Sequence, residues 1–123
     1  MLLVVVVFIG GLVGAPTRYL LDQQVGKHFG TSMPWGTLAV NVVAAGILGL
    51  LMGLSDRTRI PHAVLSLIGT GFCGALSTFS TFSADTFKLF ASGQNSKAWG
   101  NVLLNLILGM ALLSLGYLVG SAF

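Results

Sequence analysis

The chain has 123 residues, of which 54% are hydrophobic and only 7% are charged, and its formal net charge is +3. Soluble proteins carry about a quarter charged residues, so this composition excludes a soluble domain and predicts an all-α integral membrane protein that forms a single domain over residues 1–123. The six basic residues are scattered along the chain and form no patch, which argues against a nucleic-acid partner.

The first two predicted membrane-spanning helices cover residues 2–21 and 35–54. Each reaches the ~20 apolar residues that a helix needs to cross the hydrocarbon core of a bilayer. The chain starts with LLVVVVFIGGLVGA and lacks a basic region before it. We therefore interpret the first segment as a retained span and not as a cleaved signal peptide. Residues 22–34, between the two spans, are predicted to form a polar connector.

The third predicted span, residues 63–90, is up to 28 residues long, which is more than a simple crossing requires. Gly69, Gly71 and Gly74 lie in its first half and predict a third helix that is broken near its middle. A continuous, slightly kinked helix is the alternative. The fourth span is predicted at residues 99–119, and residues 55–61 and 92–97 are the remaining connectors.

The orientation of the four predicted spans in the membrane is weakly specified by charge. Arg57 and Arg59 lie on the side of the chain termini, and Lys27, Lys88 and Lys97 lie on the opposite side, with Arg18 as a fourth if it reaches that interface. This difference is too small for the positive-inside rule to select one orientation. We hypothesise that the chain inserts both ways up and forms an antiparallel dual-topology homodimer in the lipid bilayer.

Small residues recur in the first three predicted spans, where they allow helices to approach closely. The pattern predicts oligomerisation, although about half of these residues are expected to pack helices within one subunit. They are Gly10, Gly11, Gly14, Ala44, Ala45, Gly46, Gly49, Gly69, Gly71 and Gly74.

The polar groups available at membrane depth are neutral. No Asp, Glu, Lys or His lies in the middle of a predicted span, and no base is positioned beside Ser77 or Ser80, so an enzyme is not expected. Amides and hydroxyls can donate hydrogen bonds to an anion without trapping it against a full opposite charge. The donors are Thr37, Asn41 and the hydroxyls of residues 77–83, whereas Asn101 and Asn105 fit equally a role in bonding a neighbouring helix.

Phe79 and Phe82 are three residues apart and share one face of a helix. The edge of an aromatic ring is electropositive, so two rings turned edge-on would offer a weakly electropositive lining. Together with Asn41 and the hydroxyl run, the pair predicts a path for a small anion. If the third helix is broken, the freed main-chain carbonyls would suit a hard cation such as Na⁺, which two facing breaks in a dimer would share.

Three segments of the chain resemble the signature segments of the CrcB/Fluc fluoride channels. They are GGLVGAPTRYLL at residues 10–21, PWGTLAVN at residues 34–41 and GFCGALSTFSTFSAD at residues 71–85, and the resemblance extends over essentially the whole chain. It implies an antiparallel homodimer with two pores that passively exports F⁻ from the bacterial cytoplasm across the inner membrane and so gives fluoride resistance.

The resemblance also assigns roles by position. Phe79 and Phe82 match the pore-lining phenylalanines, and Asn41 matches the asparagine that contacts fluoride. Gly74 and Ser77 match the positions whose carbonyls hold a structural Na⁺ at the dimer interface, although many relatives have Thr at the second position. The remaining matches are the polar pore positions Thr37, Ser80, Thr81 and Asn105 and the vestibule arginine Arg18.

Two other classes of membrane protein compete with this interpretation. A small dual-topology multidrug/proton antiporter also has four short helices, but it needs a titratable carboxylate at depth to couple efflux to protons. A purely structural membrane subunit would leave the asparagine, the hydroxyls and the phenylalanine pair without a purpose.

Overall fold

The structure is a computed structural model that describes residues 1–30, 33–57, 60–77 and 79–122, except for the side chains of residues 57, 79 and 80. Within these residues, four helical segments are long and apolar enough to cross a membrane: Leu2–Phe29, Trp35–Asp56, His62–Ala91 and Asn95–Ala122. They confirm the predicted all-helical, multi-pass membrane protein, and each of the four overlaps one predicted span.

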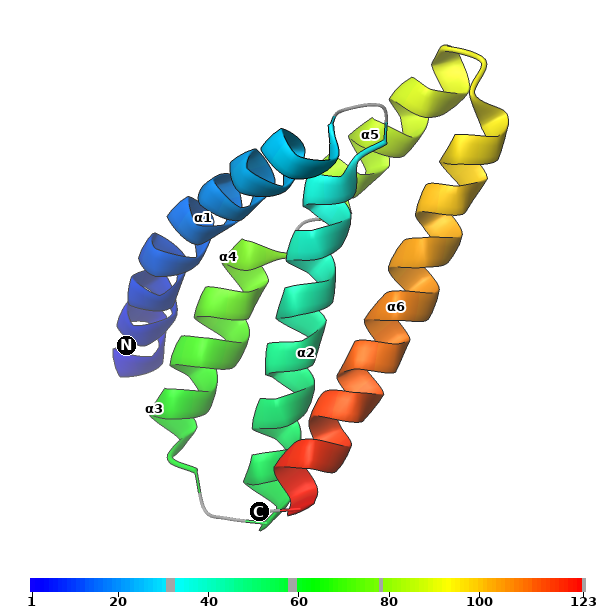
Figure 1. The fold of residues 1–123 in the computed structure, drawn as a ribbon. Coiled ribbons are helices and arrows are strands. Elements are labelled where there is room, and N and C mark those ends of the chain that lie inside the picture. The colour runs from blue at the N-terminus through cyan, green and yellow to red at the C-terminus, as the bar shows by residue number, and fades with distance from the viewer. Residues whose placement is uncertain (31–32, 58–59, 78, 123) are drawn as a thin grey trace.

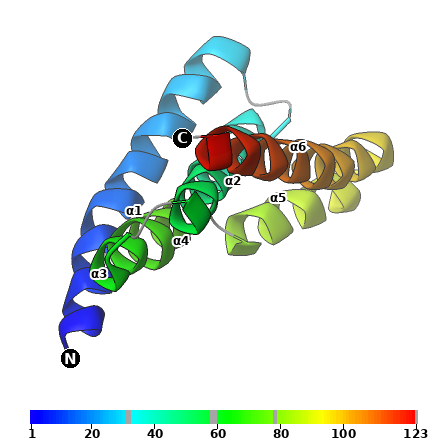
Figure 2. The same ribbon diagram turned by 90° about the horizontal axis from the view of Figure 1, so that it is seen from below.

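The helices are α1 (Leu2–Phe29), α2 (Trp35–Arg57), α3 (His62–Leu65), the π-helix η1 (Ser66–Cys73), α4 (Gly74–Leu76), α5 (Phe79–Ala91) and α6 (Asn95–Ala122). Helices α1 and η1 lie side by side, and α2 packs along α6 (Figure 1). Seen from below, α2 separates the pair formed by α1 and the first part of the third span from the pair formed by α5 and α6 (Figure 2).

Two of the predicted connectors are partly helical, which corrects their boundaries. Helix α1 continues beyond residue 21 as far as Phe29 and ends at Gly30, whose φ of 82° favours glycine. Helix α6 begins at Asn95, inside the predicted connector 92–97 and directly after the turn at Gly93. Hydropathy indicates where a chain leaves the hydrocarbon core of the bilayer. A helix can continue beyond that point and ends at a residue whose backbone angles are not helical, such as a glycine with positive φ.

Glycines bring α2 and α6 into close contact. A Cβ atom placed on Gly49 would overlap the carbonyl oxygen of Leu113, and one placed on Gly120 would overlap that of Leu50. Small residues stabilise helix pairs in membranes in this way, because they let the two backbones approach. At the exposed end of the pair, the hydroxyl of Tyr117 donates a hydrogen bond to Asp56.

The glycines of the first span have the same use within the subunit. A Cβ atom on Gly10 would overlap the carbonyl oxygen of Leu67, and one on Gly14 would overlap that of Phe72. Gly10 and Gly14 therefore belong to the part of these small residues that was expected to pack helices within one subunit, because the third span of the same chain already occupies their open side. Gly74 differs, since no atom lies within 4 Å of the place its Cβ would take.

The buried core is small and lies where α2 meets the third span. Val40, Ala44 and Leu76 form it, with Phe72 packed against them. Large apolar side chains on the outer helices are exposed, including Phe8 at 66% and Leu106 at 59%. Such surfaces suit a protein whose solvent is lipid, in which apolar side chains need no protein cover.

The third span changes its helical form along its length. Its first part contains the π-helix η1, and α4 ends at Leu76. Ser77 has an extended backbone, with φ −76° and ψ 152°, and α5 begins at Phe79. Helix α4 contacts α1, whereas α5 contacts α6. Residue 78 lies outside the described residues, so the predicted break of the third helix stays a prediction.

Candidate functional site

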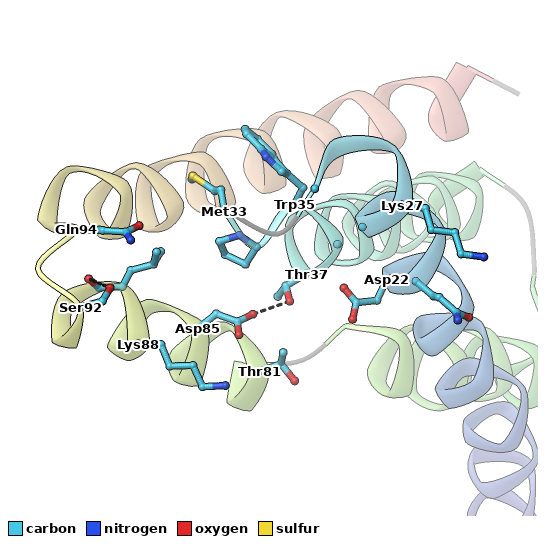
Figure 3. A pocket seen from close by; sticks show the side chains of 16 residues that line it. Asp22, Lys27, Met33, Trp35, Thr37, Thr81, Asp85, Lys88, Ser92 and Gln94 are labelled. Atoms are coloured by element: carbon cyan, nitrogen blue, oxygen red, sulfur yellow. Dashed lines mark hydrogen bonds between the residues drawn. The ribbon is translucent and has the colours of Figure 1, made fainter.

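An open cavity of about 770 Å³ lies at one end of the helix bundle, between α1, α2 and α5 (Figure 3). Its lining includes Asp22 and Lys27 from α1 and Asp85 and Lys88 from α5, so both signs of charge face it. Thr37, from the first turn of α2, donates a hydrogen bond from Oγ1 to Oδ2 of Asp85 at 2.9 Å. This bond joins α2 to α5 beside the cavity, which we call the mouth of the bundle.

A smaller pocket of about 160 Å³ adjoins the mouth and shares three of its lining residues, Asp22, Thr37 and Thr81. Arg18 also lines it, from the turn of α1 that precedes Asp22. The structure thus brings Arg18, the predicted vestibule arginine, together with Thr37 and Thr81, two of the predicted polar pore positions. The carboxylate of Asp22 lines the same pocket, so both signs of charge lie beside these hydroxyls.

A third pocket lies farther from the mouth, along the membrane-spanning part of the helices. It is an open groove of about 390 Å³ between α2, α6 and the first part of the third span. Four of the predicted site residues line it: Asn41 from α2, Asn105 from α6, and Gly74 and Ser77 from the third span. The rest of its lining is mostly apolar, so these polar groups face a mainly hydrophobic hollow.

A continuous chain of hydrogen bonds starts at this groove. Asn41 donates from Nδ2 to Oδ1 of Asn105 at 3.0 Å, and Asn105 donates from Nδ2 to the main-chain oxygen and Oδ1 of Asn101 at 2.8 and 3.0 Å. Asn101 donates from Nδ2 to Oγ1 of Thr86 at 2.9 Å, and Thr86 donates to the carbonyl oxygen of Phe82 at 2.8 Å. The chain links α2, α6 and α5.

The sequence left open whether Asn101 and Asn105 line the anion path or bond a neighbouring helix, and these hydrogen bonds answer part of that question. Asn101 is fully buried and connects α6 to α5, and Asn105 connects α6 to α2. Both therefore bond neighbouring helices. Asn105 also lines the groove beside Asn41, so the two roles coexist in that residue.

Gly74 and Ser77, the predicted cation positions, lie at the two ends of the short helix α4. The hydroxyl of Ser77 donates back to the carbonyl oxygen of Cys73 at 2.9 Å, so the side chain is occupied within its own turn. The end of a helix leaves its last carbonyls without intrahelical partners, and α4 ends at Leu76, directly before Ser77. Gly74 presents an open side with no neighbouring atoms.

The hydroxyl and phenylalanine run enters α5 at its first turn. Phe82 is half-buried in α5. Phe79 and Ser80 belong to the same helix by their backbone, but their side chains lie outside the described residues. The prediction that the two phenylalanine rings line one path therefore stays a prediction.

Sequence reasoning missed two residues that bind across the bundle. Asp85 was quoted only as the end of a motif, yet its carboxylate accepts the hydrogen bond of Thr37 at the mouth. Thr86 was not singled out, yet it connects Asn101 to Phe82. Its position four residues after Phe82 was the available signal, because a helical threonine can bond the carbonyl one turn earlier.

A family model described as "CrcB-like protein, Camphor Resistance (CrcB)" matches residues 5–117 of the chain. This range includes every residue of the mouth, the small pocket, the groove and the hydrogen-bonded chain.

Individual relatives match over a similar range. The chain is 43% identical over 102 residues to Fluoride-specific ion channel FluC 1 of Nocardia farcinica, covering 83% of this chain and 69% of the relative. It is 44% identical over 107 residues to Fluoride-specific ion channel FluC of Shewanella amazonensis, covering 87% and 86%. It is 40% identical over 110 residues to the FluC of Shewanella loihica, covering 89% of each.

Proposed function

The chain belongs to the CrcB-like protein family, and we propose that it is a fluoride-selective ion channel. The observation that carries the proposal is its identity of 40–44%, over most of its length, to relatives that are named fluoride-specific ion channels. These names denote a channel and not an enzyme. The multidrug/proton antiporter remains the alternative that a transport measurement must exclude.

The groups around the pockets support the transfer of this activity. Arg18, Thr37 and Thr81 gather near the mouth, and Asn41 lies deeper beside Asn105. Conduction requires binding that is favourable enough for entry and weak enough for exit. A positive charge near the mouth attracts the anion, and neutral amide and hydroxyl donors inside then replace its water without holding it behind an opposite charge.

We expect purified protein in liposomes to release loaded F⁻ rapidly and Cl⁻ negligibly. A membrane potential that is negative inside drives an anion outward, by about 2.3 kcal/mol per 100 mV for a unit charge. Applying such a potential should therefore speed the efflux and would match passive export from a cytoplasm. A fluoride electrode outside the liposomes measures release. Equal release of both halides, or release that requires a proton gradient, would contradict a fluoride channel.

We further propose that two copies pair as an antiparallel dual-topology homodimer with two pores, each subunit contributing one domain of residues 1–123. The small difference in basic residues between the two sides supports this arrangement. The polar groove at Asn41 also supports it, because neutral polar groups facing lipid would be costly and a second subunit would cover them.

The proposed topology predicts that a C-terminal reporter is seen on both sides of the bacterial inner membrane. A reporter active only in the cytoplasm and one active only in the periplasm should each give a signal when fused after residue 123, and both fusions should fractionate with the inner membrane. The matched control is a fusion to a protein of single orientation. Signal from one compartment alone would contradict dual topology.

We propose that the third helix is broken at Ser77 and that the carbonyls of Gly74 and Ser77 would hold a structural Na⁺ at the dimer interface. The extended backbone of Ser77 and the open side of Gly74 support the fit. Among the residues that the structure describes, no group of three His, Cys, Asp or Glu side chains gathers around a metal site, so the ligands would be main-chain oxygens. Bound there, the cation would join the two subunits electrostatically.

Removal of Na⁺ is therefore expected to diminish fluoride release. Protein purified and reconstituted with a large organic cation in place of Na⁺ should release F⁻ more slowly, and readdition of Na⁺ should restore the rate. The measurement is the initial efflux rate at constant ionic strength. An unchanged rate after thorough exchange would contradict the cation site.

A further inference from the structure

We propose that Thr86 and Asn101 are positioning residues that fix which way the amide groups of Asn105 and Asn41 point. The four side chains and the carbonyl of Phe82 form one continuous chain of hydrogen bonds. The inference deepens the proposed function and rests on it, because the direction of the Asn41 amide has a functional consequence only if that amide serves a passing anion.

The direction of the chain starts at the hydroxyl of Thr86. A threonine hydroxyl has one proton, and here it is donated to the carbonyl oxygen of Phe82 at 2.8 Å. The Oγ1 atom can then only accept from Asn101, which lies 2.9 Å away. Asn101 must therefore turn its NH₂ group, and not its oxygen, toward α5.

The next amide is oriented by this choice. With its NH₂ directed at Thr86, Asn101 presents Oδ1 to Asn105, beside its own main-chain carbonyl oxygen. Both groups are acceptors, at 3.0 and 2.8 Å from Nδ2 of Asn105. The opposite orientation of Asn105 would place its oxygen against two oxygens, so the NH₂ group of Asn105 must face Asn101.

The orientation then reaches the groove. Because the NH₂ group of Asn105 faces Asn101, its Oδ1 faces Asn41 and requires a donor at 3.0 Å. Asn41 must therefore present its nitrogen on the α6 side of the groove that both residues line. A hydroxyl on α5, together with the main-chain carbonyl oxygen of Asn101, thus fixes the position of the donor end of an amide on α2 through two intervening amides.

Burial makes the arrangement hard to replace. Asn101 has no exposed surface, so water cannot take over a lost bond, and a buried polar group without a partner is costly. Hydrogen bonds in such surroundings also strengthen one another along a chain. If these residues served only to hold helices together, the direction of the amides would not affect the rate of fluoride efflux. If Thr86 and Asn101 are positioning residues, loss of the amide orientation should slow fluoride efflux, and an experiment can measure this.

The first test is Thr86→Val, which keeps the shape of the side chain and removes both the acceptor and the donor. We expect about tenfold slower F⁻ efflux, because a misplaced amide at Asn41 would slow the passage of the anion, just as a misplaced group in an active site slows a reaction. Thr86→Ser keeps the hydroxyl and should retain the wild-type rate. The matched control is Thr17→Val, because Thr17 also bonds the carbonyl four residues earlier, at 2.6 Å, but serves no amide. Equal rates for Thr86→Val and wild type would overturn the proposal.

Combining Thr86→Val with Asn41→Ala separates positioning from general destabilisation. If Thr86 acts through Asn41, the valine should slow efflux little further in the Asn41→Ala channel, because residues of one network are not additive. Full additivity of the two effects would overturn the proposal. Wild-type protein without fluoride release would instead defeat the proposed function, and the orientation would then be tested by spectroscopy.

The spectroscopic test needs no variant that must fold. The chain contains four asparagines, Asn41, Asn95, Asn101 and Asn105, so selective ¹⁵N labelling yields few side-chain amide signals. We expect the side-chain protons of Asn101 and Asn105 to resist exchange with deuterated water, whereas those of Asn95, exposed at the start of α6, exchange at once. Equally fast exchange at all four would overturn the chain of oriented amides.

Discussion

Replacement of Gly49 by valine is expected to separate α2 from α6 and to lower the free energy of unfolding by about 3 kcal/mol. A Cβ atom at this position would overlap the carbonyl oxygen of Leu113, which belongs to the backbone and cannot rotate away. Lipid provides no hydrophobic force that drives apolar helices together, so close backbone packing carries much of the association. A gap forced between the two helices would lose that packing along several turns.

The experiment is an unfolding titration of the purified protein in detergent, followed by helix content. The matched control is Gly26→Ala in α1, because no atom lies within 4 Å of a Cβ atom placed there. The control should change the free energy of unfolding by no more than about 1 kcal/mol, and in the stabilising direction, since alanine favours a helix over glycine. Equal unfolding midpoints for the two variants would contradict the role given to the glycine.

The four spans could be predicted because the bilayer imposes a simple condition on sequence. A helix that crosses hydrocarbon must be apolar over about 20 residues, and all four segments meet this condition without any knowledge of packing. The ends of the helices were not predictable in the same way. The polar segment from Asp22 to Phe29 is helical because extending a helix that has already formed avoids the cost of nucleation, and Gly30 is where the backbone leaves the helix.

The partners of the glycines could not be predicted, because helix periodicity shows which residues share a face but not which helix covers it. The sequence left open which of the small residues pack within one subunit, and the structure places the third span of the same chain against Gly10 and Gly14. The same limit applies to the polar residues. Asn41 and Asn105 are 64 positions apart, and only the packing of α2 against α6 brings their amides within 3.0 Å.

The chemical character of the site followed more directly from the sequence. Neutral donors inside apolar spans led to the prediction of a polar path, and Thr37, Asn41 and Asn105 all line pockets in the structure, whereas the path itself stays a prediction. The role of Asp85 was not predictable, because a carboxylate near the end of a span is normally solvated and only the tertiary structure shows that it accepts the hydrogen bond of Thr37. The connections between the donors depended on tertiary structure and were not visible in the sequence.

Phe82→Ile is expected to suppress fluoride efflux while leaving the folded assembly intact. Isoleucine keeps the apolar bulk of the side chain but lacks the electropositive ring edge that we propose for the anion path. Phe82 is half-buried on α5, and its carbonyl oxygen is bound by Thr86, so the local backbone is anchored independently of the ring. The substitution should therefore remove a chemical property more than it disturbs the helix.

The expected decrease is about tenfold, which corresponds to the loss of roughly 1.4 kcal/mol of stabilisation at the highest barrier of the path. Phe87→Ile is the matched control, because Phe87 lies on the same helix with 71% of its surface exposed. Initial F⁻ efflux from liposomes compares the two variants, and size-exclusion chromatography checks that both keep the wild-type assembly. If Phe82→Ile conducts like Phe87→Ile and the wild type, the aromatic edge at this position is dispensable.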